Sequence, residues 1–209
     1  MTFPSLELET QLLARYGQVI GLDEVGRGAI AGPVEVGAAL LTSSASTAIP
    51  SGLRDSKLIA ESKRATVSTL VQEWVPTAVG DASVQEIETK GISWALQQAA
   101  LRALEALNPD KGVILLDGSH NFLQGLVKLP VVMRTKADRD CAIVSAAALT
   151  AKVSRDNRMT ELHEQYPMFE WASNKGYASE SHIAALKSHG PSEHHRLSWL
   201  GKILQDELF

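Results

Sequence analysis

The sequence lacks several features that would place it outside the ordinary globular proteins. It has one cysteine, Cys141, in 209 residues, so an internal disulfide is excluded and we expect a reducing, cytoplasmic setting. No basic segment followed by an apolar run opens the chain, so no secretory signal is expected. The longest apolar stretches are far too short to cross a bilayer. The hydrophobic content of 44% nevertheless supports a substantial core.

The chain also lacks the positive charge of a general nucleic-acid binder. Its formal net charge is -4 at pH 7. The charge is unevenly distributed, because the segment from Lys128 to Arg158 is locally basic. A polyanion would fit there, although charge alone favours a solvated helix face.

Hydrophobic patterning predicts a mixed α/β sheet. The apolar runs from Gln18 to Leu22 and from Val113 to Leu116 are typical of central strands that are covered on both faces. Further strands are expected at residues 34–41, 79–84 and 130–134, and helices at residues 60–75, 91–107, 141–162 and 179–188. We expect one domain over residues 1–209, with residues 160–209 forming a helical C-terminal subdomain.

Acidic residues follow three of the expected strands. Asp23 and Glu24 end the first strand, and Asp117 ends the strand that runs from Gly112 to Leu116. Asp138 follows the short strand that ends near Arg134. The ends of neighbouring strands in an open α/β sheet converge on one crevice, where four carboxylates would repel one another. A divalent cation removes that cost, and oxygen ligands suit Mg²⁺ or Mn²⁺. For any one of these acids a solvated turn residue is the simpler interpretation; together they favour a metal site.

Asp23 and Glu24 are adjacent, so on a regular strand they would point to opposite faces. They share a site only if the strand ends or bends, and the following Gly26-Arg27-Gly28 segment provides that freedom. Glycines also let backbone N–H groups approach a phosphate or ribose, and Arg27 adds a bidentate donor. Taken alone, this segment fits a tight hairpin turn equally well.

In its context, from Gly21 to Val34, the segment resembles the opening motif of the ribonuclease HII family. Further resemblances follow in order: Asp55-Ser56-Lys57-Leu58, Leu116-Asp117-Gly118, Lys136-Ala137-Asp138, Ser145-Ala146-Ala147, Ala151-Lys152-Val153-Ser154-Arg155-Asp156, Lys175-Gly176-Tyr177 with His182, and His195-Arg196 with Ser198. The resemblance covers about Gly17 to Trp199. Two departures are Asn174, where the family usually has His, and Trp199, where it usually has Phe. The first bears on how the loop that carries Tyr177 is held.

The resemblance implies a ribonuclease H-like fold, with a central mixed five-stranded sheet flanked by helices and a helical C-terminal part. It implies an endonuclease that hydrolyses the RNA strand of RNA–DNA hybrids and cuts 5′ of ribonucleotides in duplex DNA, leaving 5′-phosphate and 3′-hydroxyl ends. Such an enzyme would act as a monomer in ribonucleotide excision repair. The catalytic, metal-binding residues would hold two Mn²⁺ or Mg²⁺ ions; they are Asp23, Glu24, Asp117 and Asp138.

The resemblance also implies a set of substrate-binding residues. Gly26, Arg27 and Gly28 would read the ribose 2′-OH, and Tyr177 would stack on the sugar that follows. The phosphate-side candidates are Ser56, Lys57, Lys152 and Arg155. Lys152 and Arg155 fit structural helix charges equally well.

Two other acids, Asp140 and Asp156, compete with Asp138 for the fourth ligand position. The Lys-Ala-Asp motif favours Asp138. Asp156 lies far along a helix, and we expect it to pair with a nearby arginine.

The last five residues contain Gln205, Leu208 and Phe209 in the spacing of the short peptide by which bacterial proteins dock on the sliding clamp. The end of an amphipathic helix is the alternative interpretation.

Three other kinds of protein are alternatives. A non-catalytic nucleic-acid binding module of the same fold would have lost at least one acid, and all four are present. Ribonuclease HIII carries an N-terminal substrate-binding domain, for which we expect no room before residue 23. A small-molecule phosphohydrolase with the same two-metal chemistry would need neither Arg27 flanked by glycines beside the acids nor the Tyr177 motif.

Overall fold

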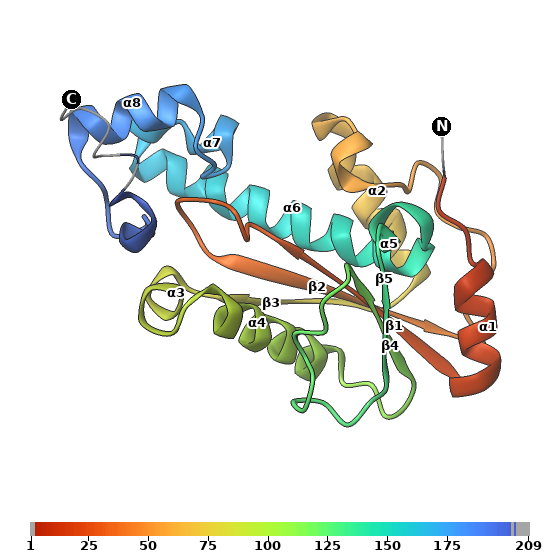
Figure 1. Cartoon of the computed structure of the whole chain (residues 1–209). Coiled ribbons are helices and arrows are strands. Elements are labelled where there is room, and N and C mark those ends of the chain that lie inside the picture. The colour runs from red at the N-terminus through yellow and green to blue at the C-terminus, as the bar shows by residue number, and fades with distance from the viewer. Residues whose placement is uncertain (1–2, 202, 204–209) are drawn as a thin grey trace.

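A mixed five-stranded sheet forms the centre of the computed structural model, which describes residues 3–201 and residue 203 (Figure 1). This arrangement confirms the predicted fold class. The strand order is β3-β2-β1-β4-β5. β1 pairs antiparallel with β2 and parallel with β4, β2 pairs antiparallel with β3, and β4 pairs parallel with β5. The strands are β1 (Gln18–Val25), β2 (Val34–Thr42), β3 (Thr77–Ala82), β4 (Val113–Asp117) and β5 (Val131–Arg134).

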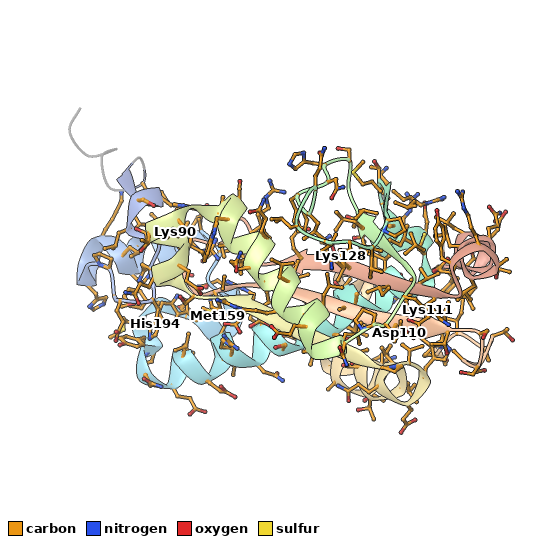
Figure 2. The ribbon with its side chains drawn as sticks, turned by 90° about the horizontal axis from the view of Figure 1, so that it is seen from below. Lys90, Asp110, Lys111, Lys128, Met159 and His194 are labelled. Atoms are coloured by element: carbon orange, nitrogen blue, oxygen red, sulfur yellow. The ribbon has the colours of Figure 1, made fainter. Side chains whose placement is uncertain are left out.

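Helices cover both faces of the sheet. α6 and α2 lie over one face and α3 and α4 over the other, while α7 and α8 sit together beyond one end of α6 (Figure 1). Seen from below, α4 crosses the strands between Lys90 and Asp110 (Figure 2). The helices are α1 (Glu7–Tyr16), α2 (Glu61–Trp74), α3 (Val84–Lys90), α4 (Ile92–Leu107), α5 (Ala137–Asp140), α6 (Ala142–Gln165), α7 (Trp171–Asn174) and α8 (Glu180–His189), with 3₁₀ turns at Ser56–Leu58, Pro167–Phe169 and Leu197–Trp199.

Four of these helices were not among those expected from the patterning: α1, α3 and the short helices α5 and α7. α3 begins with a capping box, in which Ser83 accepts a hydrogen bond from the Glu86 N–H and the Glu86 carboxylate accepts one from the Ser83 N–H. α1 places a buried carboxylate, Glu9, against the first turn of α6, where it accepts a hydrogen bond from the Ile143 N–H at 3.0 Å. None of the helices in the described ranges has the length and apolarity needed to cross a bilayer.

Alternating side chains of the sheet supply two separate apolar layers. Val19 and Leu115 pack towards α6 and α2, whereas Ile20, Leu22 and Leu116 pack towards α4. The strands β1 and β4 are therefore buried on both sides, as their continuous apolar runs predicted. α6 lies very close to β1, because a Cβ added to Gly21 would come within 2.5 Å of the Ile143 carbonyl oxygen.

The C-terminal helices pack against the loop between β1 and β2. A third buried cluster joins Ile30 and Ala31 of this loop to Trp171, Leu186 and Leu200. An isolated bridge pairs Ala31 with His195. Residues 171–200 thus pack against the loop that contains the glycine-rich segment after β1 and support it.

Candidate active site

The four predicted metal-binding acids come from three neighbouring elements. Asp23 and Glu24 lie in β1, Asp117 is the last residue of the adjacent β4, and Asp138 lies in the short helix α5 after β5. β1 runs one residue further than the expected end at Asp23 and Glu24, because it keeps pairing with β2 as far as Val25. Asp23 and Glu24 therefore sit on opposite faces of a continuing strand.

The pKa of the Asp23 carboxyl reflects its position within this cluster of acids. Burial, followed by repulsion from the other three acids, raises the pKa of the Asp23 carboxyl well above its usual value, and Lys57 partly opposes the effect. Burial also raises the pKa of Asp138, with a further contribution from Asp117. The folded chain thus holds carboxylates where their charge is unfavourable, which is typical of a site built for a cation or for proton transfer.

Hydrogen bonds fix the position of the α5 carboxylate relative to β4. The Ala137 N–H donates to the Asp117 carboxylate at 2.6 Å. The Ser145 hydroxyl on α6 donates to the Asp138 carbonyl oxygen at 2.6 Å. The Lys57 ammonium lies 3.4 Å from the Asp138 carboxylate. Asp138 is therefore tied to the sheet, to α6 and to the Ser56–Leu58 turn.

The donor set suits a hard divalent cation, because it consists of carboxylate oxygens alone. The two competing acids are occupied elsewhere. Asp140 pairs with Arg139 at 2.7 Å and with Arg134 at 3.3 Å. Asp156 pairs with Lys152 and with Arg64, as expected for this residue. Among residues 3–201 and 203, no three acidic, histidine or cysteine side chains already stand close enough to hold an ion, so bringing the acids together requires side-chain movement.

A cavity of about 400 Å³ opens beside Asp23 and contains most of the predicted substrate-binding residues. Its lining includes Gly26, Arg27, Gly28, Ser56, Lys57, Lys152 and Tyr177. A second cavity of about 260 Å³ lies on the other side of Glu24 and Arg27 and reaches Asp117. Glu24 and Arg27 line both cavities, and their charged groups are 3.5 Å apart.

The two glycines beside Arg27 have different environments. Gly26 has φ +80°, and a Cβ there would lie 2.1 Å from the Arg155 Nε. Gly28 meets nothing within 4 Å of an added Cβ. Gly26 is therefore required by the packing beneath the loop, whereas Gly28 leaves open space at the surface of the cavity.

Arg155 does not line the cavity, so the prediction that it contacts a phosphate is wrong. Its side chain is fully buried, and its guanidinium donates to the carbonyl oxygens of Pro33, Ala31 and Lys175 at 2.8–2.9 Å. The guanidinium also lies under the Tyr177 ring, 5.6 Å from its centroid. The alternative interpretation as a structural helix charge is the one the geometry supports.

The loop that carries Tyr177 is held from several sides. Tyr177 itself is 39% exposed and faces the cavity. Asn174, the residue that replaces the usual His, accepts a hydrogen bond from the Gly176 N–H and donates to the Phe169 carbonyl oxygen. The His182 Nδ1 lies 2.8 Å from the Tyr177 carbonyl oxygen. The departure at Asn174 therefore leaves the loop anchored.

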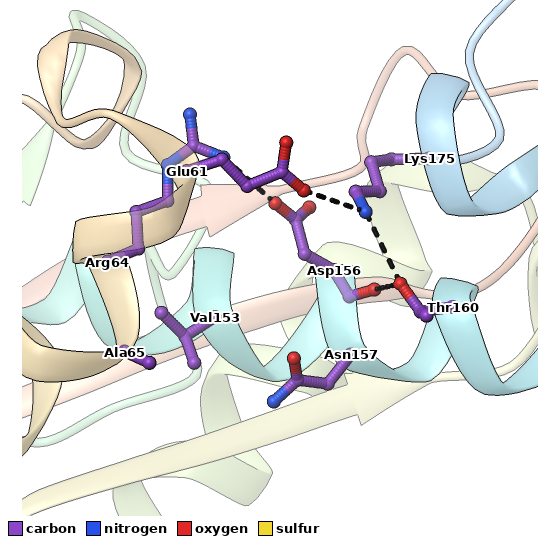
Figure 3. Close-up of a pocket in the computed structure, with 8 residues that line it drawn as sticks. All are labelled: Glu61, Arg64, Ala65, Val153, Asp156, Asn157, Thr160 and Lys175. Atoms are coloured by element: carbon purple, nitrogen blue, oxygen red, sulfur yellow. Dashed lines mark hydrogen bonds and ion pairs between the residues drawn. The ribbon is translucent and has the colours of Figure 1, made fainter.

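A small cavity of about 100 Å³ next to this loop contains a charged network (Figure 3). Lys175 pairs with Glu61 of α2 at 3.0 Å and donates to the Thr160 hydroxyl of α6 at 3.3 Å. On the same side Asp156 accepts from Arg64 at 3.1 Å and from Lys152 at 2.7 Å. The network links α2, α6 and the Tyr177 loop, and it also fixes Lys152 at the cavity wall.

Sequence reasoning gave no role to three buried polar residues around the loops, Arg196, His182 and His195. The His182 and His195 Nε2 atoms are 3.0 Å apart, and the His182 Nε2 also accepts a hydrogen bond from the Trp171 indole. Arg196 is fully buried beneath the glycine-rich segment. The only sequence signal for them is their place in the late motifs, because burial is not visible in spacing.

Comparisons with known proteins identify the family of the chain. The family model "Ribonuclease HII" matches residues 20–202. A "Ribonuclease HII" of Streptomyces griseus is 44% identical over 94% of this chain and 84% of its own length. Among solved structures, the ribonuclease H2 of Pyrococcus horikoshii superposes with a TM-score of 0.74 at 25% identity, covering 90% of this chain and 98% of that one.

A ribonuclease HIII structure, described as Bst-RNase HIII in complex with Mn²⁺, shares the fold with a TM-score of 0.65 at 21% identity, covering 90% of this chain and 67% of that one. The match to the family model and the similarity to the curated relative span nearly all of the described chain, including the acidic cluster and both loops beside it. The chain therefore belongs to the ribonuclease HII family.

Proposed function

We propose that this ribonuclease H-type endonuclease hydrolyses the RNA strand of RNA–DNA hybrids and cuts on the 5′ side of single ribonucleotides embedded in duplex DNA. The ends it leaves would be a 5′-phosphate and a 3′-hydroxyl. One observation carries the proposal: the partly buried, mutually repelling acids around Asp23 adjoin a cavity that is lined by a glycine-rich loop and an exposed tyrosine. The first feature suits phosphodiester hydrolysis, and the second suits recognition of a ribose.

Four acids would hold two divalent cations, Mg²⁺ or Mn²⁺; they are Asp23, Glu24, Asp117 and Asp138. When bound, the ions supply activation of the attacking water and stabilisation of charge on the leaving 3′-oxygen. The raised pKa of Asp23 supports this assignment, because a cation would offset the repulsion that now opposes its ionised form. The all-oxygen donor set also fits these ions better than zinc.

Ribose recognition would come from the segment Gly26-Arg27-Gly28. The 2′-OH is the group that distinguishes RNA from DNA at one position, and backbone N–H groups recognise a hydroxyl without reading the base. Tyr177 would stack on the sugar after the ribonucleotide, because its ring is half exposed and faces the same cavity. Lys57, Lys152 and Ser56 would contact phosphates and position the strand.

The partners and setting of the enzyme belong to the same proposal. We expect it to work as a monomer in the removal of ribonucleotides from cytoplasmic DNA. The predicted clamp-binding residues Gln205, Leu208 and Phe209 lie outside the described residues, so docking on the sliding clamp stays a sequence-based prediction.

The test is cleavage of a labelled DNA duplex that contains one ribonucleotide, with Mg²⁺, with Mn²⁺ and with EDTA. We expect a cut 5′ of the ribonucleotide that requires a metal ion. Cleavage of a long hybrid but not of this duplex would contradict the role of Tyr177 at an RNA–DNA junction. Cleavage of neither substrate would favour a non-catalytic binding module.

A matched pair of variants separates the active acid from its neighbour. Asp138→Asn should reduce cleavage by orders of magnitude, since it removes a proposed metal ligand. Asp140→Asn changes the same kind of residue two positions further on, where the side chain makes only surface ion pairs, and it should keep wild-type cleavage. Equal losses in the two variants would contradict the assignment of Asp138.

A further inference from the structure

Two buried arginines lie beneath the loops of the cavity, and they hold different backbone segments. Arg155 donates to the carbonyl oxygens of Ala31, Pro33 and Lys175. Arg196 donates to Gly26 at 2.7 Å, to Arg27 at 2.9 Å and to Gly32 at 2.9 and 3.2 Å. Both side chains are fully buried. Of these two arginines, only Arg196 forms hydrogen bonds with the peptide groups of the segment that is proposed to read the ribose.

These contacts determine which way the peptide groups face. In a planar trans peptide the carbonyl and the following N–H point in opposite directions, and the described chain contains no cis peptide bond. The carbonyl oxygens of Gly26 and Arg27 point down to the Arg196 guanidinium. The N–H groups of Arg27 and Gly28, which complete the same two peptides, must therefore point the other way, towards the side on which this segment lines the cavity.

The guanidinium suits this task because of its shape. Its planar fork presents donors in fixed directions, and Arg196 uses it to reach three carbonyl oxygens of one loop. The ring of Trp199 packs against the other side, 4.9 Å from the guanidinium carbon. A lysine would keep the charge but would present a single ammonium, which cannot hold the two peptides in the same orientation.

We infer that Arg196 is a positioning residue for substrate specificity: it turns the Arg27 and Gly28 N–H groups towards the cavity, where they meet the ribose 2′-OH. The inference rests on the proposed function and adds a residue that does not touch the substrate. Arg196 acts through the backbone, so it affects the preference for a ribonucleotide rather than the general affinity for a duplex.

The experiment measures binding in the Asp138→Asn background, in which cleavage should be reduced by orders of magnitude. Anisotropy titrations with Mg²⁺ compare a duplex that contains one ribonucleotide with the same duplex in all-DNA form. We expect Arg196→Lys to reduce the ratio of the two affinities by about tenfold, which is the loss of one to two neutral hydrogen bonds. Affinity for the all-DNA duplex should stay within about twofold.

Arg102→Lys is the control, because it removes the same guanidinium fork at a site in α4 that bonds to the Asp81 carbonyl and the Glu86 carboxylate and lines neither cavity of the site. It should lower the unfolding midpoint yet keep the ribonucleotide preference. Equal losses of preference in both variants, or a normal preference in Arg196→Lys, would overturn the inference. If the parent protein itself shows no preference, the proposed ribose recognition fails, and the inference fails with it.

A second measurement decides the matter if Arg196→Lys does not fold. In the isotopically labelled parent protein, the Arg27 and Gly28 amide resonances should shift on adding the ribonucleotide duplex and should shift less with the all-DNA duplex. Amides that respond equally to the two duplexes would overturn the inference, because the N–H groups would then not face the 2′-OH.

Discussion

Replacing Gly28 by alanine should separate stability from activity. An added Cβ at Gly28 meets no atom within 4 Å, and the backbone there is not left-handed. The substitution reduces the freedom of the unfolded chain, so we expect the free energy of unfolding to stay level or to rise by about 0.4–1 kcal/mol. For a domain of this size the unfolding midpoint would rise by at most about 4 °C.

The same methyl group should reduce activity on a ribonucleotide, because Gly28 lines the cavity and an added Cβ there occupies open space where the ribose would approach the loop. Losing two hydrogen bonds from the loop to the 2′-OH costs about 1–3 kcal/mol. That range corresponds to a fall in kcat/KM of about 5–160-fold on a duplex with one ribonucleotide. Initial rates at several substrate concentrations, together with a thermal melt, measure both effects on one preparation.

Gly26→Ala is the control at the other glycine of the segment. Its left-handed φ of +80° costs an alanine about 1–2 kcal/mol. The contact of 2.1 Å with the Arg155 Nε adds an overpacking cost of about 1–3 kcal/mol. Gly26→Ala should therefore lose both stability and activity. A Gly28→Ala protein with wild-type kcat/KM would refute the reasoning, because the ribose could not then lie against this segment.

Three further predictions concern the acids, the buried histidines and the metal. Asp23→Asn should reduce turnover by orders of magnitude and yet stabilise the metal-free protein at neutral pH, since it removes a desolvated carboxylate that the neighbouring acids repel. A lower free energy of unfolding in a urea titration would contradict this. Burial, together with repulsion from His182, lowers the folded-state pKa of His195 to about 4. Between pH 6.5 and 4 the unfolded chain therefore binds more protons than the folded chain. The contribution of His195 to the free energy of unfolding, at most roughly 3 kcal/mol, is lost as the pH falls through that window. A His195→Asn variant whose free energy of unfolding has the same slope against pH as the parent protein would count against this. EDTA should abolish cleavage, and added Mn²⁺ should restore it. Above its Kd, Mn²⁺ should also raise the unfolding midpoint in proportion to the logarithm of its concentration. The unfolding midpoint of Asp23→Asn should respond far less to Mn²⁺.

Some parts of the fold could not be predicted from the hydrophobic pattern of the sequence, and the structure shows the physical reasons. α1 carries a charged residue, Glu9, at a fully buried position, so its apolar face is interrupted where the carboxylate meets the first turn of α6. β1 continues past the apolar run, because pairing with β2 rather than hydrophobicity sets its end. Periodicity reports which residues are apolar, and it does not report which backbone groups find partners.

The sequence by itself determined the sheet, the sandwiching helices and the positions of the four acids. Apolar runs and strand-end carboxylates are local patterns, and the ordered motifs indicated the ribonuclease HII family before any contact was known. Only the tertiary structure separated the basic residues by role. Lys57 stands at the cavity, whereas Arg155 and Arg196 lie beneath it with their donors on backbone carbonyls. A cation in a sequence can be a ligand for phosphate or a support for a loop, and burial decides between them, since a buried guanidinium is stable only when its hydrogen bonds are satisfied inside the protein.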